Sequence, residues 1–421
     1  STQGYSSAAS DVYKRQVIVI ALIVVIIALA VVISNKSKKD GSKSTTEAGT
    51  EAGSETMRSG QFDIDYAKQV TKLADYSGVA ITVSNDYEIN DTAKQTYLTN
   101  VLQSYGADAY KQVTDRDTVA DGDYVKVDYT GYKDGKAFDG GSATDVMLDV
   151  TNNSQVGGSS FIDGFTKPII GAKVGDKVKG DVTFPEDYGN DDLNGQTVTF
   201  EYTVKGIYSA DPVALADMTD EQVNTVFGKA GVTTNAQLTT QIEKDLKQQL
   251  YSAEVDKIKS YMIENSTVEI PDEYLQARLN EYIASFTKEN VKDGQTLKKY
   301  LKSNYNMTVD QATEKWKENL TDQIKTEFIF GLIAEKENIK MDDDAFNSYV
   351  DYIVSASNGQ FSKASEVYKY FGSGHKDEGK TYLKNQYLVN KAIDTVTEKA
   401  NVTFEDGSAA PDTSSGSADA E

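Results

Sequence analysis

Hydrophobic and polar positions alternate through the middle of the chain, as they do in strands with one buried face. The clearest case is the run Tyr124-Val-Lys-Val-Asp-Tyr129, which Gly131 ends. Further short strands are expected over residues 146–150, 177–184 and 196–207. Asp134-Gly135 predicts a hairpin turn, because glycine accepts the positive φ that such a turn needs. Since only a short helix is expected between the strands, near residues 165–170, the pattern predicts a small, strongly bent antiparallel sheet over one helix.

The pattern changes to a helical period after Pro212. Three threonines each stand three residues before a glutamine, which is the capping-box signature of a helix start: Thr219, Thr234 and Thr308. Apolar stripes at helical spacing run through Leu238, Ile242, Leu246 and Leu250, and through Leu275, Leu279, Ile283 and Phe286. Further helices are expected over residues 309–337, 342–356 and 376–399. We predict an all-α domain over residues 212–405, and a disordered tail over residues 406–421, which are rich in Ser, Ala, Gly and Asp.

A tyrosine-rich stretch, residues 61–120, leads into the strands. Residues 79–83 predict a strand, and residues 91–105 predict a helix in which Tyr97, Val101 and Tyr105 recur every four positions. A small α/β region is therefore expected here.

The N-terminal residues carry three different signals. Residues 6–16 read as the translation of a sequencing-library adapter. We therefore expect residues 1–16 to be an artefact that is not part of the natural protein. The unbroken apolar run that follows predicts a transmembrane signal anchor over residues 17–34; a cleaved signal peptide is the rival, but no small-residue cleavage site follows. Residues 35–60 read as a flexible linker. Lysines that follow the apolar run favour a cytoplasmic location for the residues after it. The long linker favours the opposite orientation, in which most of the chain lies outside the cytoplasm.

Five blocks of the alternating region resemble, in order and spacing, an FKBP-type peptidyl-prolyl isomerase domain over residues 121–208. They are Val125-Lys-Val-Asp-Tyr-Thr-Gly131, Lys136-Ala-Phe-Asp139, Phe161-Ile-Asp-Gly-Phe165, Phe184-Pro-Glu-Asp-Tyr188 and Val198-Thr-Phe200. The resemblance implies a bent antiparallel sheet with one short helix. It also implies peptidyl-prolyl cis–trans isomerase activity that uses no cofactor and no metal.

The family's proline pocket, carried over residue by residue, comprises Tyr129, Phe138, Asp139, Phe161, Ile162, Phe165, Tyr188 and Phe200. In this pocket the backbone N–H of Ile162 would hold the substrate carbonyl, and Phe165 would form the floor. The chain departs from the family at Val146, where an aromatic residue is usual, and at Phe165, which replaces a tryptophan. Taken alone, Phe161 or Phe200 is better explained as core. The whole ordered set, with Asp139 and Tyr188 among apolar residues, favours a pocket.

Such a pocket can act without a nucleophile. Resonance gives the amide C–N bond a rotation barrier of roughly 18–20 kcal/mol, and X-Pro exchange is slow enough to limit folding. The twisted amide loses resonance, so its carbonyl is less polar than that of the planar substrate. A dry aromatic environment therefore favours the twisted state over the planar one.

The helical domain resembles the C-terminal chaperone region of trigger factor. The likeness runs from Met218-Thr-Asp-Glu-Gln-Val-Asn-Thr-Val-Phe-Gly228, through a long helix, to Val268-Glu-Ile-Pro-Asp-Glu273. It implies helical arms whose exposed apolar residues hold unfolded polypeptides; a closed bundle whose stripes are all core is the alternative. The family's ribosome-binding signature, Gly-Phe-Arg-x-Gly-Lys-x-Pro, is absent from the sequence, so ribosome binding is not supported.

Composition narrows the class of protein. The net charge of −22 argues against nucleic acid as a partner, and the absence of cysteine excludes disulfides and thiolate metal sites. The one histidine, His375, lies in a glycine-rich stretch and is expected in a loop, without a metal or catalytic role. Trp316 lies in an amphipathic helix pattern and is expected in the core.

We therefore expect an α+β protein: an N-terminal transmembrane helix, an FKBP-type sheet and an all-α chaperone domain. Its expected function is prolyl isomerisation and holding of unfolded or proline-containing clients, for exported or extracytoplasmic proteins, at the cell membrane. Two alternatives remain open. One is a non-catalytic binding or adhesion module with an isomerase-like fold; the other is a cytoplasmic trigger-factor-type chaperone.

Overall fold

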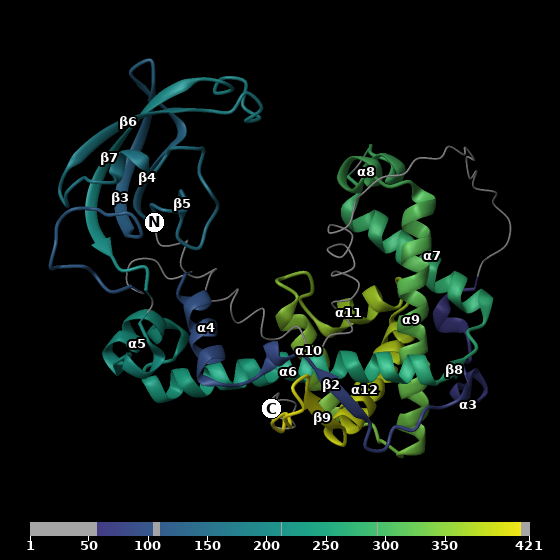
Figure 1. The fold of residues 1–421 in the computed structure, drawn as a ribbon. Helices are drawn as coiled ribbons and strands as arrows, with labels where there is room; N and C mark the ends of the chain where they lie inside the picture. Colours follow the sequence, from purple (N-terminus) through teal and green to yellow (C-terminus); the bar gives the residue numbers. More distant parts are fainter. Residues whose placement is uncertain (1–56, 104–109, 212, 293, 414–421) are drawn as a thin grey trace. The chain divides into compact units, whose positions relative to one another are not determined.

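The computed structural model describes residues 57–103, 110–211, 213–292 and 294–413. The chain divides into two compact units (Figure 1). The sheet unit comprises residues 89–246, and the helical unit comprises residues 57–88 together with residues 247–413. The sheet unit is thus inserted into the helical unit. This division differs from the expected one, because the stretches 61–120 and 212–405 are each split between the two units.

The sheet unit is built on a five-stranded antiparallel sheet with the strand order β5-β4-β3-β7-β6. Its strands are β3 (Tyr124–Lys133), β4 (Lys136–Asp149), β5 (Ser154–Gln155), β6 (Lys177–Thr183) and β7 (Thr197–Tyr208). The alternation of hydrophobic and polar residues predicted β3, β6 and β7, because alternate side chains of each strand face a buried core. The strand expected over residues 146–150 is instead the end of β4, which begins at Lys136.

A tight turn at Asp134-Gly135 joins β3 to β4. The φ angles of these residues are 51° and 76°, and Lys133 pairs with Lys136 across the turn. Two consecutive positive φ angles are what a two-residue type I′ hairpin turn requires. The predicted hairpin is therefore confirmed.

The helices that lie wholly within the sheet unit are short. They are α4 (Asp91–Leu102), η6 (Lys167–Ile169), η7 (Leu215–Asp217), α5 (Asp220–Phe227) and η8 (Gly228–Ala230). A longer helix, α6 (Asn235–Asn265), begins in this unit and ends in the helical unit. Thr219 and Gln222 form the predicted capping box at the start of α5. The helix expected near residues 165–170 is only the 3-10 turn η6, with Pro168 at its start.

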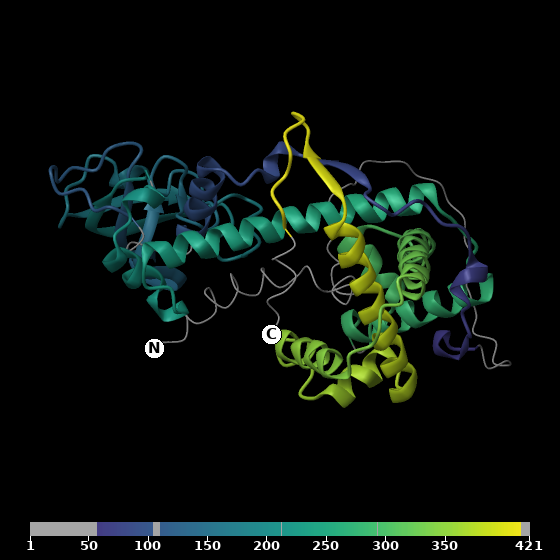
Figure 2. The ribbon, with the colours of Figure 1, turned by 90° about the horizontal axis from the view of Figure 1, so that it is seen from below.

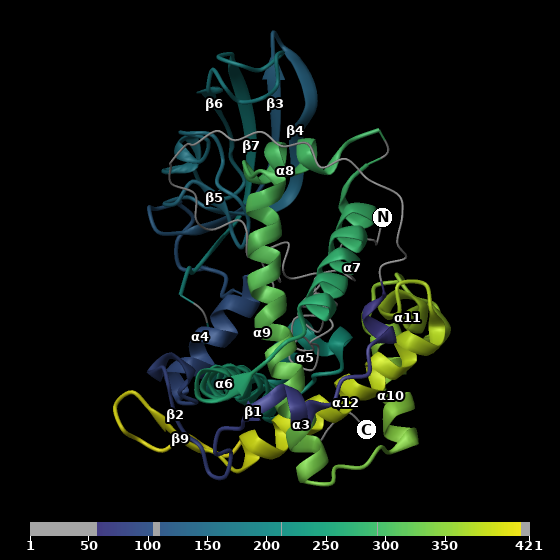
Figure 3. The same ribbon diagram turned by 90° about the vertical axis from the view of Figure 1, so that its right-hand side faces the viewer.

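The helical unit is dominated by long helices; in Figure 3, α7 and α9 run side by side and α8 joins them at one end. Its helices are η3 (Ser59–Gln61), α3 (Tyr66–Gln69), η4 (Asn85–Tyr87), α7 (Asp272–Asn290), α8 (Leu297–Tyr305), α9 (Val309–Lys336), α10 (Asp343–Ala356), α11 (Ala364–Phe371) and α12 (Lys376–Glu398). The three helices expected after residue 308 are confirmed as α9, α10 and α12. The capping box of Thr308 with Gln311 is also confirmed.

Two small sheets tie residues that precede the sheet unit to residues that follow it. The strand β1 (Val70–Lys72) pairs antiparallel with β8 (Thr267–Val268). The strand β2 (Ala80–Val83) pairs in parallel with β9 (Asn401–Phe404), which lies in the yellow hairpin of Figure 2. These long-range pairings explain why residues 57–88 fold with the C-terminal helices.

The C-terminal tail differs from the disordered segment that we expected. The N–H of Ala410 donates to the carbonyl of Val402 at 3.1 Å, so the chain turns back beside β9. The hydroxyl of Thr413 donates to the buried carboxylate of Glu254 at 2.6 Å. Residues 406–413 therefore fold back along the protein, with Thr413 buried although most of the others are exposed, and residues 414–421 lie outside the described residues.

The interior of the helical unit combines apolar clusters with one buried ion pair. Leu279 and Phe286 of α7 pack with Trp316 of α9, which is 1% exposed, so the expectation of a core tryptophan is confirmed. Arg278 forms an ion pair with Glu327 at 2.8 Å, and both side chains are buried. This pair links α7 to α9 in the interior of the unit.

The expected adapter artefact, transmembrane helix and most of the linker fall on residues 1–56 and lie outside the described residues. Among the residues that the structure does describe, no helix has both the length and the apolar character needed to cross a membrane.

Candidate functional site

A cluster of aromatic side chains lies against the sheet of the sheet unit, with Phe165 at its centre. Phe165 is only 2% exposed, and its ring stacks on that of Phe161 with centroids 4.2 Å apart. The rings of Tyr129 and Phe200 meet it edge-on, at 5.0 and 4.9 Å. The cluster therefore joins β3, β7 and the segment that leads into η6.

Phe138 and Tyr188 extend this aromatic cluster from β4 and from the loop after β6. The Phe138 ring lies 6.0 Å from that of Phe200 and 6.2 Å from that of Phe184. The ring of Tyr188, which is 48% exposed, meets Phe184 edge-on at 4.6 Å. Gly131 makes room for this packing, because a Cβ there would lie 2.6 Å from the Phe138 ring.

Ile162 contributes a half-buried side chain and a backbone N–H to the edge of the cluster. Within the described residues, this N–H donates no hydrogen bond, although the carbonyl of Ile162 accepts one from the N–H of Phe165 at 3.2 Å. A donor beside aromatic rings that has no internal acceptor can serve a bound carbonyl oxygen.

Asn153, which the sequence analysis did not single out, holds this segment in place. Its side-chain amide donates to the carbonyls of Phe161 and Ile162 at 3.2 and 2.9 Å. Its side-chain oxygen accepts from the N–H of Thr166 at 3.0 Å. Asn153 has a φ of 50°, which asparagine tolerates better than most residues. No sequence motif marks it, because its partners lie 8 to 13 residues ahead.

Burial changes the acidity of Tyr129. The pKa of its hydroxyl is raised first by burial and then by the neighbouring Tyr188, so the group stays protonated at neutral pH. A neutral hydroxyl adds no charge to the aromatic cluster, which keeps the site apolar.

The structure thus brings together six of the residues expected from the resemblance, and Tyr188 joins them through Phe184. The six are Tyr129, Phe138, Phe161, Ile162, Phe165 and Phe200. Asp139 is exposed on β4, and among the described residues no hydrogen bond or ion pair to its carboxylate is seen. Val146, which stands where the family usually has an aromatic residue, packs half-buried against the same cluster.

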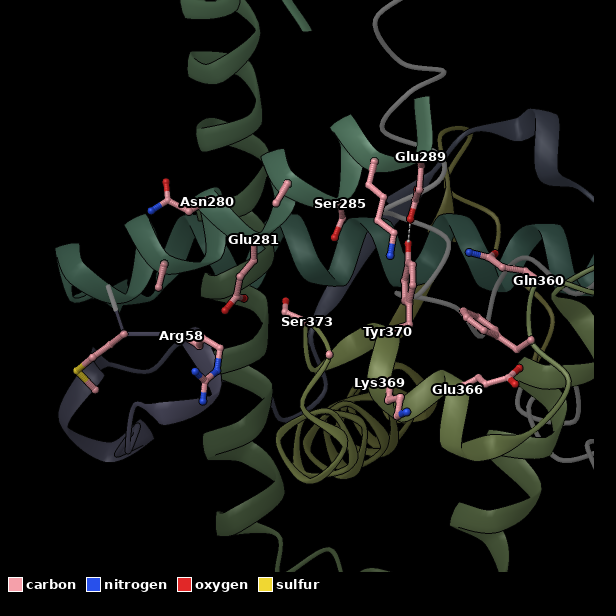
Figure 4. A pocket seen from close by; sticks show the side chains of 16 residues that line it. Arg58, Asn280, Glu281, Ser285, Glu289, Gln360, Glu366, Lys369, Tyr370 and Ser373 are labelled. Carbon is pink, nitrogen blue, oxygen red and sulfur yellow. Dashed lines mark hydrogen bonds between the residues drawn. The ribbon is translucent and has the colours of Figure 1, made fainter. Parts of the chain in front are cut away.

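A hollow, which the sequence did not predict, lies in the helical unit between α7 and α11. It has a volume of about 820 Å³, and Figure 4 shows the side chains that line it. Small residues of α7, Ala277, Ala284 and Ser285, leave this space open. At one end the hydroxyl of Tyr370 donates to Glu289 at 2.7 Å. Among the described residues, no group of three or more His, Asp or Glu side chains could hold a metal ion.

Comparisons with known proteins identify two families along the chain. Residues 116–205 match the family of FKBP-type peptidyl-prolyl cis-trans isomerases, and residues 233–398 match the C-terminus of bacterial trigger factor. The trigger factor of Agathobacter rectalis is 28% identical over 77% of this chain and 69% of its own length. Those of Clostridium botulinum (strain Eklund 17B) and Acetivibrio thermocellus are 29% and 26% identical, over 66% and 80% of this chain and 62% and 74% of theirs. A solved trigger factor chaperone aligns with 77% of this chain and 72% of its own, at 18% identity and a TM-score of 0.41.

The predicted localisation is wrong. We expected a single-pass protein of the cell membrane, mostly outside the cytoplasm, but the relatives that match the chain are trigger factors, the class named in the cytoplasmic alternative. Membrane anchoring and a role for exported or extracytoplasmic clients therefore find no support. The alternative of a trigger-factor-type chaperone fits these findings.

The FKBP-type match precedes the trigger factor match along the chain, as the sequence analysis expected. The three relatives named above are all trigger factors. The chain is therefore similar to trigger factors, with one region that matches the FKBP-type isomerases and one that matches the trigger factor C-terminus.

Proposed function

We propose that the sheet unit catalyses cis–trans isomerisation of X-Pro peptide bonds at the aromatic cluster around Phe165. One observation carries this proposal: the buried rings of Phe165 and Phe200 lie beside half-buried rings and beside the N–H of Ile162, which has no acceptor among the described residues. A proline ring placed against these side chains would be shielded from water on the apolar side. The carbonyl before the proline would accept a hydrogen bond from the Ile162 N–H.

The proposed mechanism depends on the difference between the planar and the twisted amide. Apolar surroundings stabilise the less polar, twisted amide relative to the planar substrate, and the fixed N–H holds one side of the bond while the other rotates. Each tenfold acceleration needs about 1.4 kcal/mol of such differential binding. No nucleophile and no proton transfer is required of the chain.

Asp139 and Tyr188 have a different place in this proposal. Both side chains are exposed, so neither can form the floor of the site. We assign them to its rim, where they would contact the polypeptide that flanks the proline. Phe138 lies between this rim and the buried rings.

The helical unit is proposed to hold unfolded segments of client polypeptides, as its match to the C-terminus of bacterial trigger factor suggests. The apolar stripe of α7 does not carry this role, because Leu279 and Phe286 are 3% and 4% exposed and belong to the core. The hollow between α7 and α11 supports the proposal instead, because its volume of about 820 Å³ can take several side chains of an extended segment.

Turnover of a proline tetrapeptide tests the catalytic proposal against the alternative of a non-catalytic binding module. The full chain is expected to accelerate cis–trans exchange without added metal or nucleotide. Binding of the peptide with no acceleration would favour the binding module. Light scattering of a denatured test protein tests the holding function separately, since suppression of aggregation needs no proline.

A further inference from the structure

The described chain begins with a segment that is docked against the helical unit. Arg58 reaches Glu378 of α12 with two bonds, from Nε at 3.1 Å and from Nη2 at 2.6 Å. The pKa of the Glu378 carboxyl is lowered, chiefly by this contact with the Arg58 guanidinium. Two parallel bonds between a guanidinium and a carboxylate select arginine over lysine.

The next residue is recognised through both its backbone and its side chain. The N–H and the hydroxyl of Ser59 donate to the two oxygens of Glu281 on α7, at 2.8 and 2.6 Å. One carboxylate thus binds a main-chain donor, which any residue offers, and a hydroxyl, which only serine or threonine offers at this distance from the backbone.

Two further contacts complete the docking of the segment. A Cβ on Gly60 would lie 2.7 Å from the Glu378 carboxylate and 2.8 Å from the Glu378 Cβ, so the chain approaches α12 closely at this glycine. The ring of Phe62 meets that of Tyr274 edge-on, with centroids 5.6 Å apart and planes at 74°. Residues 58–62 therefore show how α7 and α12 bind a short stretch of polypeptide.

This docked segment forms part of the wall of the hollow between α7 and α11, at one end of it. Met57 and Arg58 line it at that end, and the hollow continues along α7 toward Glu289 and Tyr370 (Figure 4). A small inner cavity of about 60 Å³ adjoins it and shares Glu281, Ser285 and Tyr370 with its wall.

The inner cavity contains a polar group that lacks a partner. Tyr282 lines it and is 6% exposed, and its hydroxyl has no hydrogen-bond partner within the described residues. A buried hydroxyl left unpaired costs about 1–3 kcal/mol, so a ligand that brings an acceptor, such as a peptide carbonyl, would be favoured there.

We propose that the surface at this end of the hollow, from Glu281 of α7 to Glu378 of α12, is a binding site for extended polypeptide that carries arginine followed by serine or threonine, and that Arg58-Ser59 is its occupant from the same chain. The inference rests on the proposed holding function and names the segments that this site prefers. Clients would compete with residues 58–62 for Glu281 and Glu378. A tethered occupant has an effective concentration in the millimolar range, so it would mask the site from weak ligands.

Fluorescence anisotropy with a labelled peptide of residues 57–64 tests the proposal on the full chain. The double variant Arg58→Ala/Ser59→Ala is expected to bind the peptide at least tenfold more tightly than the unaltered chain, because its own segment no longer competes. Adding Glu281→Gln and Glu378→Gln should remove binding, whereas adding Glu318→Gln, an exposed residue of α9, should not. A peptide with glutamate in place of the arginine should not bind.

Equal affinity of the peptide for the unaltered chain and the double variant would overturn the proposal, as would binding that survives both glutamate substitutions. Helical circular dichroism checks that each variant is folded. The exposed pair Asp65→Ala/Lys68→Ala, in the same N-terminal segment, is the matched control and should leave affinity unchanged. If the peptide fails to bind while the chain still suppresses aggregation, this inference fails and the holding function stands.

Discussion

The hydroxyl of Tyr202 on β7 donates a 2.6 Å hydrogen bond to the backbone carbonyl of Phe165. Both side chains are buried, and their rings meet edge-on at 5.4 Å. Burial, and then the neighbouring Tyr129, raises the pKa of the Tyr202 hydroxyl, which therefore stays protonated and remains a donor. Tyr202 thus fixes the backbone of the residue at the centre of the proposed isomerase site.

Replacement of Tyr202 by phenylalanine tests this relationship. The Tyr202→Phe variant keeps the ring but leaves the Phe165 carbonyl without its donor, which costs about 1–3 kcal/mol for a buried acceptor. We expect a lower midpoint in urea unfolding and a several-fold lower isomerase rate. An unchanged midpoint would show that the bond does not support this segment.

Asn153 is expected to position the Ile162 N–H rather than to contact the substrate. In Asn153→Asp, the carboxylate can still accept from Thr166 but repels the carbonyls of Phe161 and Ile162. The loss of two hydrogen bonds, each about 0.5–1.5 kcal/mol, should reduce kcat/KM roughly tenfold.

The matched control for Asn153→Asp is Asn194→Asp in the same unit, where the side-chain oxygen accepts from the N–H groups of Gly189 and Asn190. This change keeps the acceptor, so activity should be retained. The Asn153→Gly variant removes the side-chain hydrogen bonds but keeps the backbone conformation, because glycine adopts the positive φ freely. It therefore separates the contribution of the side chain from that of the backbone. Full activity in Asn153→Gly would contradict the positioning role.

Local signals in the sequence predicted local structure well. Asp134-Gly135 specified a hairpin because the turn geometry is a property of these two residues. Thr219 and Thr308 specified helix starts for the same reason, since each cap bonds within its own turn. The aromatic set of the site was found through its ordered spacing, which no single aromatic residue would have revealed.

Features that depend on distant partners could not be predicted. The pairing of β2 with β9 joins residues more than 300 positions apart, and no periodicity in either strand indicates its partner. The short helices α8 and α11, of nine and eight residues, were also not predicted. The role of Asn153 and the hollow beside α7 also appear only once segments that are separate in sequence lie together.

Glu254 links stability to pH through the C-terminal tail. Burial raises the pKa of this carboxyl, so the folded chain favours its protonated form. Its stabilising contribution is present at acidic pH and is lost as the pH rises through the raised pKa. The Glu254→Gln variant, which still accepts from Thr413, should therefore melt at a higher temperature than the unaltered chain at pH 7.

The difference between the two melting temperatures should shrink as the pH falls toward the unfolded-state pKa of glutamate, about 4.3. Calorimetry at several pH values measures it. A difference that does not change with pH would show that packing, rather than ionisation, is altered in Glu254→Gln.

The buried ion pair between Arg278 and Glu327 should be essential to the helical unit. In Arg278→Met the carboxylate of Glu327 is left buried without its cation, a change that costs about 3–5 kcal/mol. We expect unfolding of α7 and α9 at lower urea concentration, as followed by hydrogen exchange. Lys325→Met removes the partner of the exposed Asp322 in α9 and should cost at most about 1 kcal/mol.

The exchange rate of a proline peptide, measured by NMR with the full chain, tests the central claim most directly. The unaltered chain is expected to accelerate cis–trans exchange, and Phe161→Ala should lower that rate at least tenfold because it removes a ring stacked on Phe165. Ile170→Ala, at an apolar position of the same unit that is 43% exposed, should keep the full rate. No acceleration by the folded, unaltered chain, or equal rates for the unaltered chain and Phe161→Ala, would contradict the assignment of this aromatic cluster as a prolyl isomerase site.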